Sequence, residues 1–173
     1  MEKSPEQQGW IGVHTEPIAV KEFLPKKYLD ALFDGDLKEE KTAIPGEENT
    51  HFTVIYGLKE EGIPGAAVKA ISMLPGKVQI DDIEVFEKDE YNIVVALLKK
   101  SKKLLKLRDD VMQEPHYEQE FSDYKPHITL CYLDKSVDPD ELKDTFSFLK
   151  GKKLSTVSVE VDNPFVKRDT SED

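Results

Sequence analysis

The sequence predicts an α+β fold in which two similar lobes, each with a sheet and helices, enclose one cleft. The first observation is that strand-like and helix-like segments alternate along the 173 residues. The second is an internal repeat, because HFTVIYGL from His51 and HITLCYLD from His127 carry His, Thr and Tyr at the same three offsets. We therefore expect a single domain over residues 1–173 that is built from two related halves.

The repeat extends beyond these two segments. Pro64 follows the first histidine by 13 residues and Pro139 follows the second by 12, and each proline begins a helix-like segment. Gly76 and Gly151, each followed by Lys, open strand-like segments 25 and 24 residues after the same histidines. Chance could supply one such agreement but hardly all of them, so we interpret the two halves as structurally equivalent.

The individual elements follow from local patterns. β-branched and aromatic residues between turn-forming residues predict strands. These segments are residues 9–15, 51–58, 77–86, 92–98, 127–133 and 154–161. Apolar residues at helical spacing, in several cases behind a proline, predict helices. These segments are residues 25–33, 64–74, 102–112 and 139–149.

Two helices have an explicit apolar side. For the helix over 25–33, which has proline in its first turn, this side would carry Tyr28, Leu29, Leu32 and Phe33. For the helix over 102–112 it would carry Leu104, Leu107 and Val111. The cations of residues 99–108 are then the solvated side of an amphipathic helix rather than a polyanion site. The segment over residues 34–50 is rich in acidic residues and contains Pro45 and Gly46, so it is predicted to be a loop.

Composition limits the classes of partner. The chain has 24 Lys and Arg against 35 Asp and Glu, a formal net charge of −11. Long duplex nucleic acid and anionic membranes both require an extended basic face, so we expect neither as a partner. No apolar run resembles a membrane span or a signal peptide, so we expect a cytoplasmic protein. We also expect it to be a monomer. The single cysteine, Cys131, excludes an internal disulfide and is expected to be a small buried residue, not a nucleophile.

Each of the two repeated strands carries its histidine and its threonine on the same face. Side chains at i and i+2 of a strand share a face, so His51 lies beside Thr53, and His127 beside Thr129. The opposite face is expected to pack on the helices through Phe52, Val54, Tyr56, Ile128, Leu130 and Tyr132. Each His-Thr pair is then free to line the cleft between the lobes.

Two imidazoles with neighbouring hydroxyls suit displacement at phosphorus. A neutral histidine takes a proton from the attacking water while a protonated one gives a proton to the leaving oxygen. Histidine suits both roles because its ordinary pKa is about 6.5. The threonine hydroxyls would donate to the non-bridging phosphate oxygens. Neither a metal nor a cofactor is required, and chain order does not decide which histidine is the base.

The motifs HFTVIYGL and YKPHITLCYL resemble those of the 2H phosphoesterases, which include RNA 2′,3′-cyclic phosphodiesterases, also called 2′-5′ RNA ligases. The resemblance covers residues 9–165, and its most specific part is Tyr-x-Pro-His-x-Thr-Leu over 124–130. It implies a two-lobed α+β fold with an antiparallel sheet and flanking helices in each lobe. It also implies metal-independent hydrolysis of cyclic, 2′-5′ or 3′-5′ phosphodiesters, with catalytic roles for His51, Thr53, His127 and Thr129.

The short chain and the segment FEKDEYNIVV over 86–95 are similar to small phage-encoded members of this group. Some of those members, of the anti-CBASS type, degrade cyclic oligonucleotide signals of bacterial immunity, which would place the protein in the host cytoplasm. The expected partner is therefore a small nucleotide or cyclic oligonucleotide. Two other functions stay open: a non-catalytic sponge that holds the nucleotide, and an RNA 2′-5′ ligase or tRNA-end processing enzyme.

Four further residues are candidates for substrate binding. Trp10 and His14 share a face of the first strand, and His14 reaches the cleft if that strand neighbours a motif strand. The alternative for His14 is a half-exposed strand residue. Tyr124 and Lys125 immediately precede the second motif, where Tyr124 could stack on a base and Lys125 approach a phosphate. The alternative for Tyr124 is structural packing.

Overall fold

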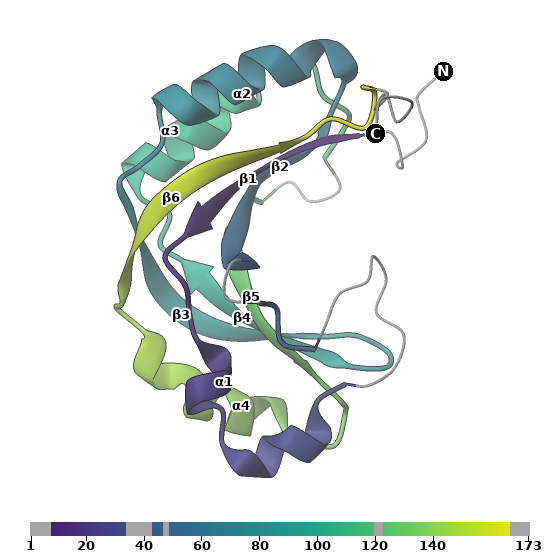
Figure 1. Cartoon of the computed structure of the whole chain (residues 1–173), viewed down its shortest axis with the longest axis vertical. Helices are drawn as coiled ribbons and strands as arrows, with labels where there is room; N and C mark the ends of the chain where they lie inside the picture. Colours follow the sequence, from purple (N-terminus) through teal and green to yellow (C-terminus); the bar gives the residue numbers. More distant parts are fainter. Residues whose placement is uncertain (1–7, 34–42, 47–48, 120–122, 167–173) are drawn as a thin grey trace, which may run out of the picture.

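The computed structural model describes residues 8–33, 43–46, 49–119 and 123–166, in which six antiparallel strands form the frame (Figure 1). The strands are β1 Gly9–Thr15, β2 His51–Leu58, β3 Lys77–Glu87, β4 Asn92–Leu98, β5 His127–Leu133 and β6 Lys153–Asp162. Their order is β1–β2–β5–β4–β3–β6, and β6 also pairs with β1, so the order closes on itself. Among the described residues, no helix is long and apolar enough to span a membrane.

The helices form two groups at opposite ends of the molecule (Figure 1). The α-helices are α1 Val20–Phe23, α2 Ile63–Ser72, α3 Lys102–Val111 and α4 Pro139–Phe146, with 3-10 helices at Lys26–Ala31, Glu60–Gly62 and Ser147–Leu149. The helices α2 and α3 contact each other, and between them they contact β1, β2 and β6, whereas α4 contacts β3 and β4. The predicted α+β class is confirmed. The strands nevertheless form one continuous antiparallel order, and the equivalence of two lobes stays a prediction.

Most predicted elements agree with the structure. The strands β1, β2, β4 and β5 have the predicted bounds, β3 is one residue longer at its end, and β6 is one residue longer at each end. The helix expected over 25–33 is wrong, because the chain forms the 3-10 helix Lys26–Ala31 instead. With three residues per turn, Tyr28 is buried but Leu29 is turned outward and is 52% exposed. The predicted loop over 34–50 lies largely outside the described residues.

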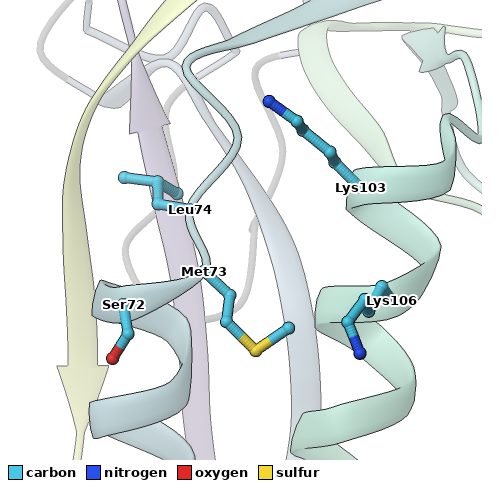
Figure 2. A pocket seen from close by; sticks show the side chains of 5 residues that line it. All are labelled: Ser72, Met73, Leu74, Lys103 and Lys106. Carbon is cyan, nitrogen blue, oxygen red and sulfur yellow. The ribbon is translucent and has the colours of Figure 1, made fainter.

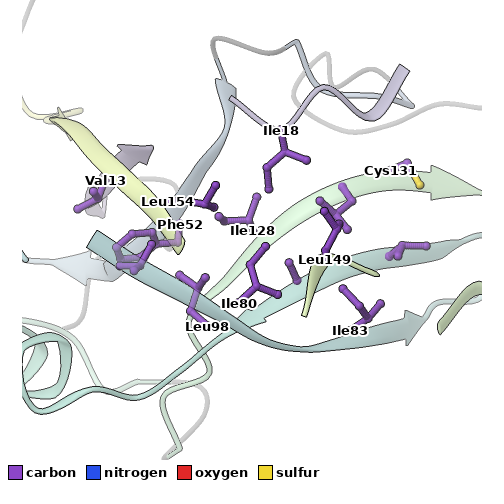
Figure 3. Close-up of a cluster of buried hydrophobic side chains, with 14 of the residues drawn as sticks. Val13, Ile18, Phe52, Ile80, Ile83, Leu98, Ile128, Cys131, Leu149 and Leu154 are labelled. Carbon is purple, nitrogen blue, oxygen red and sulfur yellow. The ribbon is translucent and has the colours of Figure 1, made fainter. Parts of the chain in front are cut away.

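The core runs along the inner faces of all six strands. Phe52, Ile128, Ile80, Leu98 and Leu154 belong to one cluster of buried side chains (Figure 3). Burying each such side chain contributes about 1.5–3 kcal/mol relative to leaving it in water. Two of these residues come from the strands that carry the histidines, so the core also holds the outward-facing side chains of those strands in place.

Both histidine-bearing strands have a β-bulge directly after the threonine. In β2, Thr53 pairs with Gly12 and Ile55 with Ile11, which leaves Val54 without an opposite residue. In β5, Thr129 pairs with Val95 and Cys131 with Val94, so the extra residue lies at the same point of the motif. A bulge inserts one residue and shifts the alternation of side chains beyond it.

The bulges explain one wrong prediction. Tyr56 was expected in the core, but beyond the β2 bulge its side chain faces outward and is 51% exposed. Ile55 and Cys131, which simple alternation assigns to the histidine face, are fully buried instead. Tyr132 is buried as expected, with its ring 5.6 Å from that of Tyr91.

Helix α3 provides a test of local stability. Ser101 precedes the helix, and its hydroxyl accepts a hydrogen bond from the Leu104 amide at 3.2 Å. We expect Ser101→Ala to lower the free energy of unfolding by about 1 kcal/mol, because an N-terminal amide loses its partner. Urea denaturation measures this change. Ser101→Asp should preserve the stability, as should Ser72→Ala, whose hydroxyl bonds to a carbonyl of its own helix. Equal losses in Ser101→Ala and Ser72→Ala would contradict the capping role.

Candidate active site

A single point of contact between β2 and β5 brings the two motifs together. Phe52 and Ile128 are the only residues of these strands that pair with each other, and both are buried. Because alternate residues of a strand face opposite ways, the neighbours of this pair on both strands turn to the other face. Those neighbours are the two His-Thr pairs, and all four side chains are half-buried.

The antiparallel register sets how the four residues lie. Extending the register of the contact by one residue on either side puts His51 across from Thr129 and Thr53 across from His127. Residues directly opposite in antiparallel strands have Cβ atoms about 4.5–5.5 Å apart, and diagonal neighbours are about 7–8 Å apart. Each imidazole thus has a hydroxyl beside it on both strands, and the two imidazoles are diagonal neighbours on one face.

The two imidazoles are held by the same local bond. His51 Nδ1 lies 2.5 Å from the carbonyl oxygen of residue 49, and His127 Nδ1 lies 2.8 Å from that of residue 125. A carbonyl only accepts, so Nδ1 carries hydrogen in both rings and Nε2 is the atom that gains or loses a proton. His116 makes the same bond to the carbonyl two residues before it, so this bond defines the tautomer and is not by itself a sign of catalysis.

The electrostatic environment of His127 favours its neutral form. Burial lowers the pKa of His127 from its ordinary value, and the nearby His51 lowers it further. The hydrogen bond to the carbonyl of Lys125 raises the pKa but is outweighed. A buried ring loses solvation of its charged form, and a second imidazole in reach makes two simultaneous positive charges unfavourable. The pair is therefore suited to hold one proton.

An aromatic ring packs edge-on against each histidine. The rings of Trp10 and His51 have centroids 5.7 Å apart, and those of Phe86 and His127 are 5.2 Å apart. The structure thus places the predicted Trp10 beside the first motif. Phe86, on β3, was missed by the sequence analysis because β4 separates β3 from β5 and no spacing links Phe86 with a histidine.

Trp10 also orients the first threonine. Its Nε1 donates to Thr53 Oγ1 at 2.9 Å. Because the indole only donates, the Thr53 hydroxyl hydrogen stays available for another acceptor. The indole lies over Gly12, where a Cβ atom would come within 2.3 Å of the ring, so a side chain at this position would displace Trp10. Among the described residues, Thr129 Oγ1 has no comparable donor.

His14 on β1 lies directly opposite His51 on β2, and the centroids of the two rings are 5.5 Å apart. The first strand therefore does neighbour a motif strand, as the interpretation of His14 as a cleft residue required. His14 Nε2 lies 2.5 Å from Glu160 Oε1, which projects from β6. Glu160 was not among the expected site residues, because only the pairing of β1 with β6 brings it to this place.

Tyr124 lies behind Thr53, on the protein side of β2. Its hydroxyl donates to the Thr53 carbonyl oxygen at 2.7 Å, and its ring faces the Arg108 guanidinium at 4.6 Å. This position fits the packing alternative for Tyr124. Lys125 has an exposed side chain, while its carbonyl accepts the hydrogen bond from His127.

Two other features lie apart from the histidines. A pocket of about 310 Å³ near the helices α2 and α3 is lined by Ser72, Met73, Leu74, Lys103 and Lys106 (Figure 2). Burial raises the pKa of the Cys131 thiol to about 12, so the thiol stays protonated and unreactive. Within the described residues, no group of three or more His, Cys, Asp and Glu side chains is arranged to hold a metal ion.

Solved structures share this fold. Usb1 from Kluyveromyces marxianus matches 92% of the chain and 95% of its own length, with a TM-score of 0.55 and 8% identity. Usb1 with uridine monophosphate matches 94% of the chain and 97% of its own length, with a TM-score of 0.56 and 9% identity. At these identities the comparison shows a shared fold. A search of curated protein sequences found no match.

A family model provides the closer relationship. The model of the anti-CBASS protein Acb1 matches residues 30–157. The matched region includes both His-x-Thr motifs, the bulge after each threonine and the loop that carries Tyr124. The match spans well over half of the chain, and the chain therefore belongs to the anti-CBASS Acb1 family.

Proposed function

We propose that this protein is a metal-independent phosphodiesterase that hydrolyses a small nucleotide, either a cyclic oligonucleotide signal or a 2′,3′-cyclic phosphate. It would act in the host cytoplasm as a viral counter-defence enzyme. One observation carries the proposal: His51 and His127 share one face of adjacent antiparallel strands, and each Nδ1 is bound to a carbonyl. Both Nε2 atoms are thereby left to exchange protons with a substrate.

The lowered pKa of His127 supports its role as the general base. Neutral His127 takes a proton from water at Nε2 as the water oxygen bonds to phosphorus. The bond from phosphorus to the leaving oxygen breaks, and protonated His51 gives its Nε2 proton to that oxygen. One water is consumed, and a phosphomonoester and a free hydroxyl are formed. The two histidines end in exchanged protonation states, and solvent restores them.

The threonines act on the non-bridging oxygens. The Trp10 indole N–H donates to the Thr53 hydroxyl oxygen. The hydroxyl hydrogen of Thr53 is therefore free to donate to the phosphate. Fixed donors aimed at oxygens where charge develops stabilise the transition state more than the ground state. Thr129 takes the equivalent place on β5, and the bulge repeated after each threonine supports the equivalence of the two lobes.

The surroundings favour a short ligand. The net charge of −11 opposes a long polyanion across the surface, but it is screened over about 8 Å at physiological salt and acts weakly on a nucleotide held by direct contacts. We assign Trp10 and His14 to the substrate side of His51, and Lys125 to that of His127. The Usb1 structure with uridine monophosphate supports a nucleotide in this fold.

Replacing either catalytic histidine tests the proposal directly. We expect His51→Ala and His127→Ala each to reduce turnover by at least about 100-fold, the lower range for losing general acid–base catalysis. His116→Ala is the matched control, because His116 has the same backbone hydrogen bond but lies outside the site. Chromatography of the products with EDTA present measures turnover. Wild-type rates in either histidine variant would show that the two-histidine mechanism is wrong.

The substrate panel separates the competing functions. It contains cyclic dinucleotides, cyclic trinucleotides, 2′-5′ oligoadenylates and 2′,3′-cyclic nucleotides, each incubated with the protein and EDTA. We expect hydrolysis of at least one member, with no loss on metal removal because proton transfer is between side chains and water. Tight binding with unchanged ligand would instead identify a sponge, and joining of RNA ends would identify a ligase.

The pH profile tests the assignment of the base. A general base must be neutral, so kcat/KM should fall as the pH drops through the lowered pKa of His127. The acidic limb of the pH profile should therefore have its midpoint below pH 6.5. Phe86→Ala uncovers the ring, and we expect the acid limb to move up toward 6.5 because the charged form regains solvent. An acid limb above 6.5 in the wild type, or no shift in Phe86→Ala, would contradict the assignment.

A further inference from the structure

We propose that Tyr124 and Arg108 are positioning residues that hold the bulge of β2 in place behind Thr53 and so determine where the Thr53 hydroxyl and His51 lie. The inference rests on the proposed phosphodiesterase activity and adds to it two residues that do not touch the substrate. It assigns Tyr124 a role different from base stacking, and it assigns a role to a cation of the basic run over 99–108.

The bulge leaves the backbone of β2 short of partners. Val54 has no opposite residue in β1, and within the described strands β2 pairs with β5 only at Phe52. Beyond that residue, the described structure has no pairing on this side of β2 until Leu58 bridges to His116, which leaves the carbonyl groups of Thr53 and Val54 without a ladder there. Buried carbonyls without a donor are costly, so such a segment persists only if side chains supply the missing bonds.

Two side chains supply these bonds to consecutive carbonyls. The Tyr124 hydroxyl donates to the Thr53 oxygen at 2.7 Å. Arg108 Nη1 donates to the Val54 oxygen at 2.6 Å. The two donors also contact each other, because the guanidinium lies 4.6 Å from the centre of the tyrosine ring. The loop before β5 and helix α3 are thereby both fastened to the same two residues of β2.

The character of both groups fits a permanent anchor. Burial raises the pKa of the Tyr124 hydroxyl far above its usual value, so it remains a donor throughout the working range of the enzyme. Burial also lowers the pKa of Arg108, although the side chain belongs to a helix whose other cations face solvent. Arg108 has no carboxylate partner in the described structure, and its donors are directed to the Val54 carbonyl and the Gln119 amide oxygen.

The bulge is the link from these residues to catalysis. Thr53 is held on its side chain by Trp10 and on its carbonyl by Tyr124, so both ends of the residue are restrained. His51 is two residues away on the same strand and shares its orientation. Catalytic groups have to be held to within about 0.5 Å, and a displacement of 1 Å can cost about 100-fold in rate.

Removal of one hydroxyl tests the inference. Tyr124→Phe keeps the ring over Arg108 but loses the bond to the Thr53 carbonyl. We expect kcat to fall about tenfold, within the range that small displacements of catalytic groups produce, with KM within about twofold. The limbs of the pH profile should stay in place, because both histidines remain. A stacking role would leave kcat unchanged in this variant, since phenylalanine stacks as well as tyrosine.

Two companion variants sharpen the result. Arg108→Lys keeps the charge but loses the planar donor pair, and we expect a similar fall in kcat. The double variant should lose less than the product of the two single losses, because both residues hold one bulge. Tyr117→Phe is the matched control, because this tyrosine is also buried and its ring contacts Lys59. Loss of the Tyr117 hydroxyl should leave kcat and KM unchanged.

Amide hydrogen exchange in β2 makes the test independent of activity. In Tyr124→Phe we expect faster exchange of the amides of residues 53–55, with global stability measured alongside. The inference is overturned if Tyr124→Phe leaves both the amide exchange and kcat unchanged. It is also overturned if the variant lowers the free energy of unfolding but leaves kcat, calculated for the folded fraction, unchanged. If the wild type hydrolyses no member of the panel, the proposed function fails, and exchange alone then decides whether Tyr124 holds the bulge.

Discussion

The pairing of Phe52 with Ile128 is the constraint on which the rest of the site depends. Among the described residues it is the only backbone pairing between β2 and β5, and both side chains are buried in the core. Burying them forces their neighbours to the opposite face, so hydrophobic packing, not attraction between polar groups, assembles the histidines and threonines. On its other side each strand pairs along its length with a different neighbour, β2 with β1 and β5 with β4, and each of these pairings has a bulge directly after the motif.

Around this contact, the protein controls where protons and donors lie. Backbone carbonyls occupy Nδ1 of His51 and His127, and burial of His127 next to a second imidazole favours a single proton shared by the pair. Trp10 supplies a donor to Thr53, so the threonine hydroxyl is left to act as a donor itself. These effects use neutral groups at short range, and for that reason an acidic exterior is compatible with a site for an anionic substrate.

The chain belongs to the anti-CBASS Acb1 family and shares the fold of Usb1. The two halves nevertheless differ in detail. Trp10 and His14 pack against His51, and Glu160 contacts His14, whereas Phe86 packs edge-on against His127. The two related motifs therefore lie in unlike surroundings, which is the condition that the proposed division into acid and base requires.

The α+β class, the bounds of four strands and the pair of His-x-Thr motifs could be predicted from the residues alone, because alternation and motif spacing are local properties of the chain. The sequence could not determine that His14 meets Glu160, that Phe86 covers His127, or that Tyr124 and Arg108 hold the Thr53 bulge. Only the tertiary structure decided these, since each joins segments far apart in the chain. Bulges also shift side-chain alternation by one residue, which moved Tyr56 to the surface against the local pattern.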